Sequence, residues 1–110
     1  MADSIQFYNR LYEKKITVYT TISKSIAVIL SQPNTNKIDP KLIREFEQMY
    51  YGEAILVEDS LSNSALNDFH RAIGDFNDKA IGIKQLKQIG MAACITLKDG
   101  IQNKEKRVNP

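Results

Sequence analysis

The sequence predicts an all-α protein that folds as an antiparallel bundle of three long helical segments. Apolar residues recur at helical spacing over residues 5–31, 40–80 and 83–101, and proline or glycine separates these segments. Hydrophobic residues make up 43% and charged residues 25% of the chain, which is typical of a globular domain. A chain of 110 residues can bury one core but not two. We therefore expect one domain over residues 1–103, followed by a basic tail, 104–110, that frays.

Residues 5–31 contain no glycine or proline and carry a seven-residue repeat, which favours one helix. Seven of the eight repeat positions are apolar or aromatic, and the exception is Lys15. The β-branched run 16–22 favours a strand locally, but the repeat continues through it and outweighs that preference. Pro33 lies in a polar loop and is expected to end the helix near Ser31. The repeat positions are Ile5, Tyr8, Tyr12, Lys15, Tyr19, Ile22, Ile26 and Ile29.

The segment 40–80 has the clearest start in the chain. Asp39 is a typical N-cap residue, and Pro40 follows it at the first helical position, where proline is preferred. Ile38 is placed to contact Ile43 across this start, as in a hydrophobic staple. We therefore expect a helix to begin at Pro40.

The continuity of this second segment is open. Apolar residues at steps of three and four continue to Ala80, but Asp59 and Ser60 are good N-caps within a polar cluster. Since no glycine or proline enforces a break there, residues 40–80 form either one bent helix or two helices joined near 59–60. The capping residues favour the break.

The last segment, 83–101, is expected to end close to Gly100. Its interior Gly90 lies near Ala92 and Ala93, so this helix has a thin face that another helix can approach closely. The alternative is that Gly90 only weakens the helix, by about 1 kcal/mol relative to alanine.

Residues 46–59 place aromatic residues, one glycine and three glutamates inside a helical pattern. A glycine within a helix costs about 1 kcal/mol relative to alanine, so Gly52 predicts a close helix crossing that accounts for this cost. The alternative is that Tyr51 points outward and contributes to a surface for a protein partner, since tyrosine is enriched at interfaces. The candidate residues for this crossing or partner surface are Tyr50, Tyr51, Gly52, Glu53 and Glu58.

Charge is distributed unevenly along the chain, although the formal net charge is only +2. Residues 1–38 have five basic and two acidic side chains, residues 39–78 have three and nine, and residues 79–110 have seven and two. We interpret this pattern as complementarity between helices that pack against one another. The alternative is a regulator or adaptor that binds an acidic or nucleic-acid partner through the basic C-terminal third.

Residue types needed for catalysis or metal binding are scarce. His70 is the only histidine and is expected at the surface or boundary of a helix, while Cys94 lies in an apolar run that suggests burial. No glycine-rich phosphate-binding motif is present. We therefore expect no enzyme activity, no catalytic residue, no metal ligand and no cofactor. The single cysteine, with no signal peptide and no membrane-spanning stretch, favours a cytoplasmic location.

A resemblance to an uncharacterised bacterial family of helical-hairpin proteins covers residues 5–75. It is carried by residues 45–59, followed by Ala65, Leu66 and Phe69. The sequence motif of the family is Phe-Trp-x-Leu-Tyr-Trp-Gly-x-Leu, followed by Val-Glu. The resemblance implies a helical hairpin, and members often carry transmembrane helices ahead of this region and have no established activity. The matching residues are Tyr50, Gly52, Val57 and Glu58, and Glu47 and Tyr51 replace the two tryptophans.

These observations favour a non-enzymatic, cytoplasmic helical module for protein interaction or oligomerisation. Its expected partner is another protein or a second copy of the chain, and nucleic acid is the less favoured alternative. Residues 1–110 offer no segment that we expect to span a membrane, and attachment to a membrane complex stays open.

Overall fold

The computed structural model describes residues 2–32, 37–57 and 59–108, and every regular element in these ranges is an α-helix. This result confirms the predicted all-α class. The helices are α1 (Ala2–Leu30), α2 (Pro40–Tyr51), α3 (Glu53–Val57), α4 (Ser60–Asn77) and α5 (Ile83–Val108).

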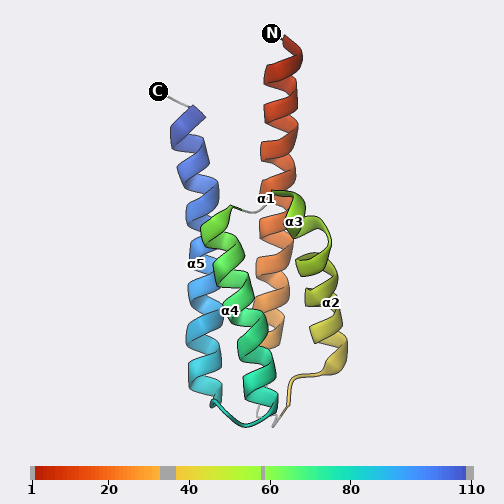
Figure 1. Cartoon of the computed structure of the whole chain (residues 1–110), viewed down its shortest axis with the longest axis vertical. Coiled ribbons are helices and arrows are strands. Elements are labelled where there is room, and N and C mark those ends of the chain that lie inside the picture. Colours follow the sequence, from red (N-terminus) through yellow and green to blue (C-terminus); the bar gives the residue numbers. More distant parts are fainter. Residues whose placement is uncertain (1, 33–36, 58, 109–110) are drawn as a thin grey trace.

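The helices form an elongated antiparallel bundle that measures 54 × 24 × 20 Å (Figure 1). Helices α1 and α4 run in one direction, and α2 and α5 run in the other. Helix α1 packs against α2, α3 and α5, while α4 packs against α5. At the end where both termini lie, α1 and α5 extend past the start of α4. The second predicted segment folds back on itself, so the bundle has four long helices, α1, α2, α4 and α5, instead of three. The short α3 connects α2 to α4.

Two breaks divide the second segment. The break predicted near residues 59–60 is confirmed, since Asp59 is the N-cap of α4 and accepts a hydrogen bond of 2.8 Å from the Ser62 N–H. A second break, which the sequence did not predict, occurs at Gly52 between α2 and α3. The predicted start of α2 is also confirmed, since Asp39 accepts a hydrogen bond of 2.9 Å from the Lys41 N–H and Pro40 opens the helix.

The last helix is longer than predicted. Gly100 lies within α5 instead of ending it, and the helix continues to Val108. The predicted end at residue 101 is therefore wrong, because a glycine ends a helix only where the backbone turns away, and Gly100 has no positive φ. The fraying of residues 104–110 stays a prediction.

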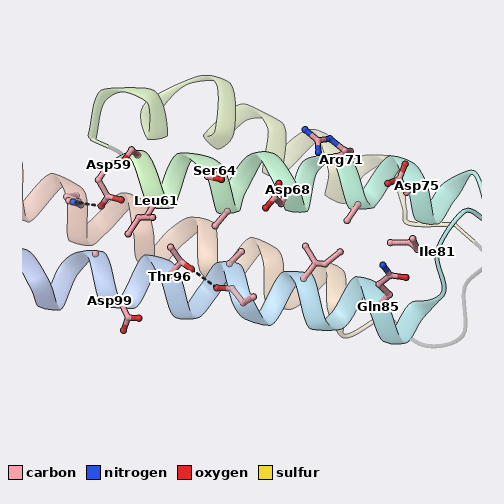
Figure 2. A pocket seen from close by; sticks show the side chains of 18 of the residues that line it. Asp59, Leu61, Ser64, Asp68, Arg71, Asp75, Ile81, Gln85, Thr96 and Asp99 are labelled. Carbon is pink, nitrogen blue, oxygen red and sulfur yellow. Dashed lines mark hydrogen bonds and ion pairs between the residues drawn. The ribbon is translucent and has the colours of Figure 1, made fainter.

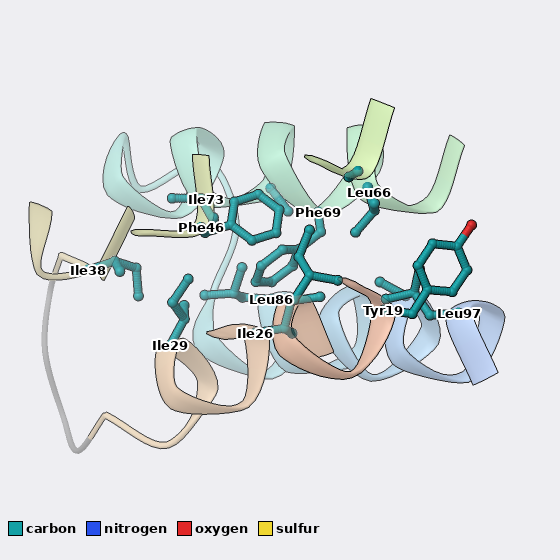
Figure 3. Close-up of a cluster of buried hydrophobic side chains, with 14 of the residues drawn as sticks. Tyr19, Ile26, Ile29, Ile38, Phe46, Leu66, Phe69, Ile73, Leu86 and Leu97 are labelled. Carbon is teal, nitrogen blue, oxygen red and sulfur yellow. The ribbon is translucent and has the colours of Figure 1, made fainter. Parts of the chain in front are cut away.

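The repeat in α1 forms the central seam of the core over its C-terminal half. Tyr19, Ile26 and Ile29 are buried against residues from the other helices (Figure 3). Toward the N-terminus the pattern is exposed, since the Tyr8 side chain is 64% accessible. Lys15, the one charged repeat position, marks the boundary between the exposed and buried halves and is itself buried.

Gly90 is the glycine at which helices approach most closely in the core. A methyl group at this position would lie 2.7 Å from Leu30 Cδ1 of α1 and 3.0 Å from Phe69 Cε1 of α4. The thin face predicted for α5 is therefore confirmed. Gly74 in α4 has no neighbouring atom within 4 Å of the same position, so it makes no comparable contact.

Helix α4 ends in a Schellman-type turn with an unusual residue at its left-handed position. The Ala80 N–H donates to the Asp75 carbonyl at 2.8 Å, and the Lys79 N–H donates to the Phe76 carbonyl at 3.0 Å. Lys79 has a φ of 64°, where glycine is the usual residue because a Cβ atom is strained there. The backbone of the turn is therefore strained at Lys79.

We predict opposite effects for alanine at two helical glycines. Gly74→Ala should raise the free energy of unfolding by up to about 1 kcal/mol, because alanine is the better helix former. Gly90→Ala should be less stable than Gly74→Ala by about 1–3 kcal/mol, because its methyl group displaces Leu30 and Phe69. Urea unfolding of both variants tests this, and an equal gain at the two sites would contradict the close packing at Gly90.

We also predict that Lys79→Gly raises the free energy of unfolding by about 0.5–1 kcal/mol, because it relieves the left-handed strain. Lys79→Ala removes the same side chain but keeps the Cβ atom, so it should leave stability nearly unchanged. Thermal melts of both variants decide the matter. A gain in the alanine variant equal to that in the glycine variant would assign the effect to the lost charge.

Candidate functional site

The sequence-predicted residues lie at the end of α2 and the start of α3. Tyr50 is half-buried, whereas Tyr51, Gly52 and Glu53 are exposed. A Cβ atom at Gly52 would meet only the backbone of its own helix, with the Gln48 carbonyl oxygen 2.6 Å away. The predicted helix crossing at Gly52 is therefore wrong, because the glycine ends α2 and faces no other helix. Glu58 lies outside the described residues.

An aromatic cluster on α2 and α4 surrounds Tyr50. Its ring stacks on His70 at 4.9 Å between centroids, and its hydroxyl forms a hydrogen bond with Asn67 Oδ1. His70 Nε2 lies 2.7 Å from Glu47 Oε2, so the histidine is a boundary residue with a carboxylate partner. Tyr51 touches the edge of this cluster but stays 60% exposed. Its role in a partner surface stays a prediction.

A groove of about 1090 Å³ runs between α4 and α5 (Figure 2). On each helix the lining residues recur at steps of four and three, which is the spacing of a coiled-coil face. Such a face has room for a further helix alongside the two that form it. The α4 wall contains Leu61, Ala65, Asp68, Ala72 and Asp75, and the α5 wall contains Gln85, Ile89, Ala92, Thr96 and Asp99.

The groove has a small-residue floor and a mainly acidic rim. Alanines occupy several of the lining positions, so the side chains of an approaching helix can penetrate deeply. Asp68, Asp75 and Asp99 form no ion pair with any described residue, and Arg71 is the cation among them. The rim is therefore acidic within a chain whose net charge is positive.

An ion pair closes one end of the groove and joins α1 to α4. Lys15 Nζ lies 3.0 Å from Asp59 Oδ2, and the lysine side chain is only 7% exposed against 38% for the aspartate. The Tyr19 hydroxyl accepts a hydrogen bond of 3.2 Å from the Asp59 N–H, and Lys15 Nζ lies 5.2 Å from the centre of the Tyr19 ring. The buried charge of Lys15 is thus neutralised by a carboxylate that also caps α4.

Gly100 provides the space for this ion pair. A Cβ atom there would lie 2.8 Å from Asp59 Oδ2 and 3.3 Å from Ser62 Oγ. The Ser62 side chain is fully buried beside the same carboxylate. A larger residue at position 100 would therefore push the carboxylate away from Lys15.

Opposing effects set the pKa of Asp59. Burial raises it, but the Ser62 N–H, the Lys15 ammonium group and the Ser62 hydroxyl together lower it more. The pKa of Asp59 therefore lies below its ordinary value of 3.8. Because the folded protein holds this carboxylate more acidic than the unfolded chain does, the ion pair stabilises the fold at neutral pH.

No group of three or more His, Cys, Asp or Glu side chains in the described part of the chain is placed to hold a metal ion. Burial raises the pKa of the Cys94 thiol, which makes it a poorer nucleophile. None of the described helices combines the length and the apolar content needed to cross a membrane.

Two residues of the sequence point to the ion pair at the end of the groove, although the hydrophobic periodicity alone does not show that they meet. Lys15 is the single charged position of the α1 repeat, and the sequence predicts Asp59 as a capping residue. A buried lysine requires a partner, so a search for a carboxylate at a helix start would have pointed to Asp59. The groove itself could not be found, because it depends on how α4 and α5 pack.

Comparison of the chain with protein-family models, with curated proteins and with solved structures finds no match. The resemblance to a helical-hairpin family therefore stays a prediction. Proposals about function rest on the residues of the groove and on their geometry.

We predict that Asp59→Asn lowers stability at pH 7 by about 1 kcal/mol, because asparagine keeps the helix cap but leaves Lys15 unpaired. The wild-type protein should lose stability as the pH falls below 3.8, as the Asp59 carboxylate becomes protonated, and the variant should lose less. Urea unfolding at several pH values measures both effects. Asp39→Asn is the control, since Asp39 caps α2 without an ion pair to any described residue. Parallel pH profiles for wild type and Asp59→Asn would contradict the assignment.

Proposed function

We propose that this protein is a non-enzymatic helical module that acts by binding another helix in the groove between α4 and α5. The observation that carries the proposal is the coiled-coil spacing of both groove walls, which no helix in the described part of the chain fills. The single cysteine supports a cytoplasmic location for this activity.

Exposed apolar side chains support an interaction role. Leu61, which lines the groove at the end near both termini, is 71% exposed. Ile55 and Leu56 on α3 are 58% and 70% exposed, and Phe7 on α1 is 59% exposed. Helix α3, the start of α4 and the N-terminal part of α1 lie in the half of the bundle that contains both termini (Figure 1). Large apolar side chains at the surface are candidates for contact with a partner.

The alternative, an adaptor for an acidic or nucleic-acid partner, draws on the exposed Lys84, Lys87 and Lys98 of α5. Met91 and Ile95 lie among these lysines on the same side of the helix, and apolar side chains offer nothing to phosphate groups. This mixture favours a protein partner. Nucleic-acid binding that weakens steeply with salt would favour the alternative instead.

We predict that a photo-crosslinking residue in place of Gln85, an exposed residue of the groove wall, forms a covalent product with a protein in cells. The same residue in place of Arg44, which is exposed on α2 away from the groove, should give much less product. Mass spectrometry then identifies the crosslinked protein. Equal products at both positions, or none at Gln85, would contradict a helix-binding groove.

A further inference from the structure

We propose that the groove between α4 and α5 receives α5 from a second copy of this chain, so that two copies form a symmetric antiparallel dimer. This inference rests on the proposed function and names the helix that the groove binds. The argument uses the outer face of α5, the charges on the two surfaces and the distances between them.

Helix α5 has an amphipathic outer face that the bundle does not use. Residues 84, 87, 91, 95 and 98 follow one another at steps of three and four, so they share one side of the helix. Met91 is 60% exposed and Ile95 is 57% exposed. Lys84, Lys87 and Lys98 flank them and are also exposed. This face has an apolar centre and basic ends, and it carries no acidic residue.

The groove has the complementary character. Beyond the Lys15–Asp59 ion pair, its lining contains three aspartates and one arginine. Its lining includes small apolar residues, among them the exposed Ala92 of the α5 wall. A basic helix with an apolar centre therefore matches the groove in charge and in shape, and the chain itself contains such a helix.

The spacing of the charges agrees with an antiparallel pairing. Asp75 lies near Gln85 at one end of the groove, and Asp99 lies near Leu61 at the other (Figure 2). Gln85 and Asp99 are 14 residues apart on α5, or about 21 Å along the helix. Lys84 and Lys98 are also 14 residues apart. An antiparallel second copy can therefore place Lys84 beside Asp99 and Lys98 beside Asp75 at the same time.

This antiparallel alignment of the two α5 helices is compatible with two-fold symmetry. When Lys84 of each copy meets Asp99 of the other, the midpoint of the contact falls between Met91 and Ala92. The flexible Met91 side chain then meets the small Ala92 of the second copy, which has room for it. Each copy gives the same face and receives the same face, as a two-fold symmetric dimer requires.

Charge reversal tests the proposal with variants that complement each other. Asp75→Lys with Asp99→Lys reverses the groove, and Lys84→Glu with Lys98→Glu reverses the outer face of α5. In sedimentation equilibrium, each double variant alone should have a dimer dissociation constant at least about tenfold higher than that of wild type. The reason is that like charges then meet at both halves of the interface. An equimolar mixture of the two should dimerise about as well as wild type, since every contact is again between opposite charges.

Matched controls reverse the same number of charges on α1 and α2. Glu13→Lys with Glu45→Lys, and Lys24→Glu with Lys41→Glu, should leave dimerisation unchanged, since all four side chains are exposed away from the groove. Circular dichroism melts show whether each variant folds, and recovery on mixing requires that both partners are folded. A loss of dimer in the controls equal to that in the groove variants would overturn the proposal.

The outcomes separate this inference from the proposed function. A wild-type dimer that the groove variants do not weaken, or that mixing does not restore, would overturn the α5 pairing. A monomeric wild type whose Gln85 crosslinks to a different protein would also overturn it while leaving the helix-binding function intact. A monomer with no crosslink at Gln85 would overturn both.

Discussion

The need to neutralise one buried cation organises one end of this bundle. Lys15 occupies the α1 seam where an apolar residue is expected, so its ammonium group must meet a carboxylate in the folded state. Asp59 provides that carboxylate and at the same time caps α4, which sets where α4 begins against α1. Gly100 of α5 leaves room for the pair. Three helices are thus aligned at one level of the bundle, and one end of the groove lies at this level.

Helix α5 connects the core with the surface that we assign to binding. Leu86 and Leu97 are fully buried in the core, and Gly90 lets α1 and α4 approach closely. Another side of the same helix forms one wall of the groove, and the outer side carries exposed lysines and apolar residues. Because one rigid helix carries all three faces, tight packing of its buried face holds the groove wall and the outer face in fixed relative positions. This rigidity favours recognition of another helix, since little ordering is needed on binding.

The charged segments form fewer ion pairs with one another than the sequence suggested. Complementarity between the basic first segment and the acidic middle appears as the Lys15–Asp59 pair. Among the described residues, however, no ion pair joins α5 to the acidic middle segment. Lys84, Lys87 and Lys98 of α5 and the aspartates of the groove rim are therefore available for contacts between molecules. Charges at such an interface mainly select the partner and its direction, and buried apolar contacts provide most of the affinity.

The sequence alone determined the helical class and the start of α2, because caps and periodicity are local properties of the chain. It favoured the break before α4 without excluding one bent helix, and it gave a close approach at Gly90 as one of two possibilities. It placed the helix crossing at Gly52 and the last helix end near Gly100, and both were wrong. Several structures favour glycine, including helix ends, close packing and room for a neighbouring side chain, and the sequence does not distinguish between them. Only the tertiary structure decided between these roles. It likewise decided that Lys15 meets Asp59 and that α4 and α5 leave a groove, since both depend on how distant segments align in space.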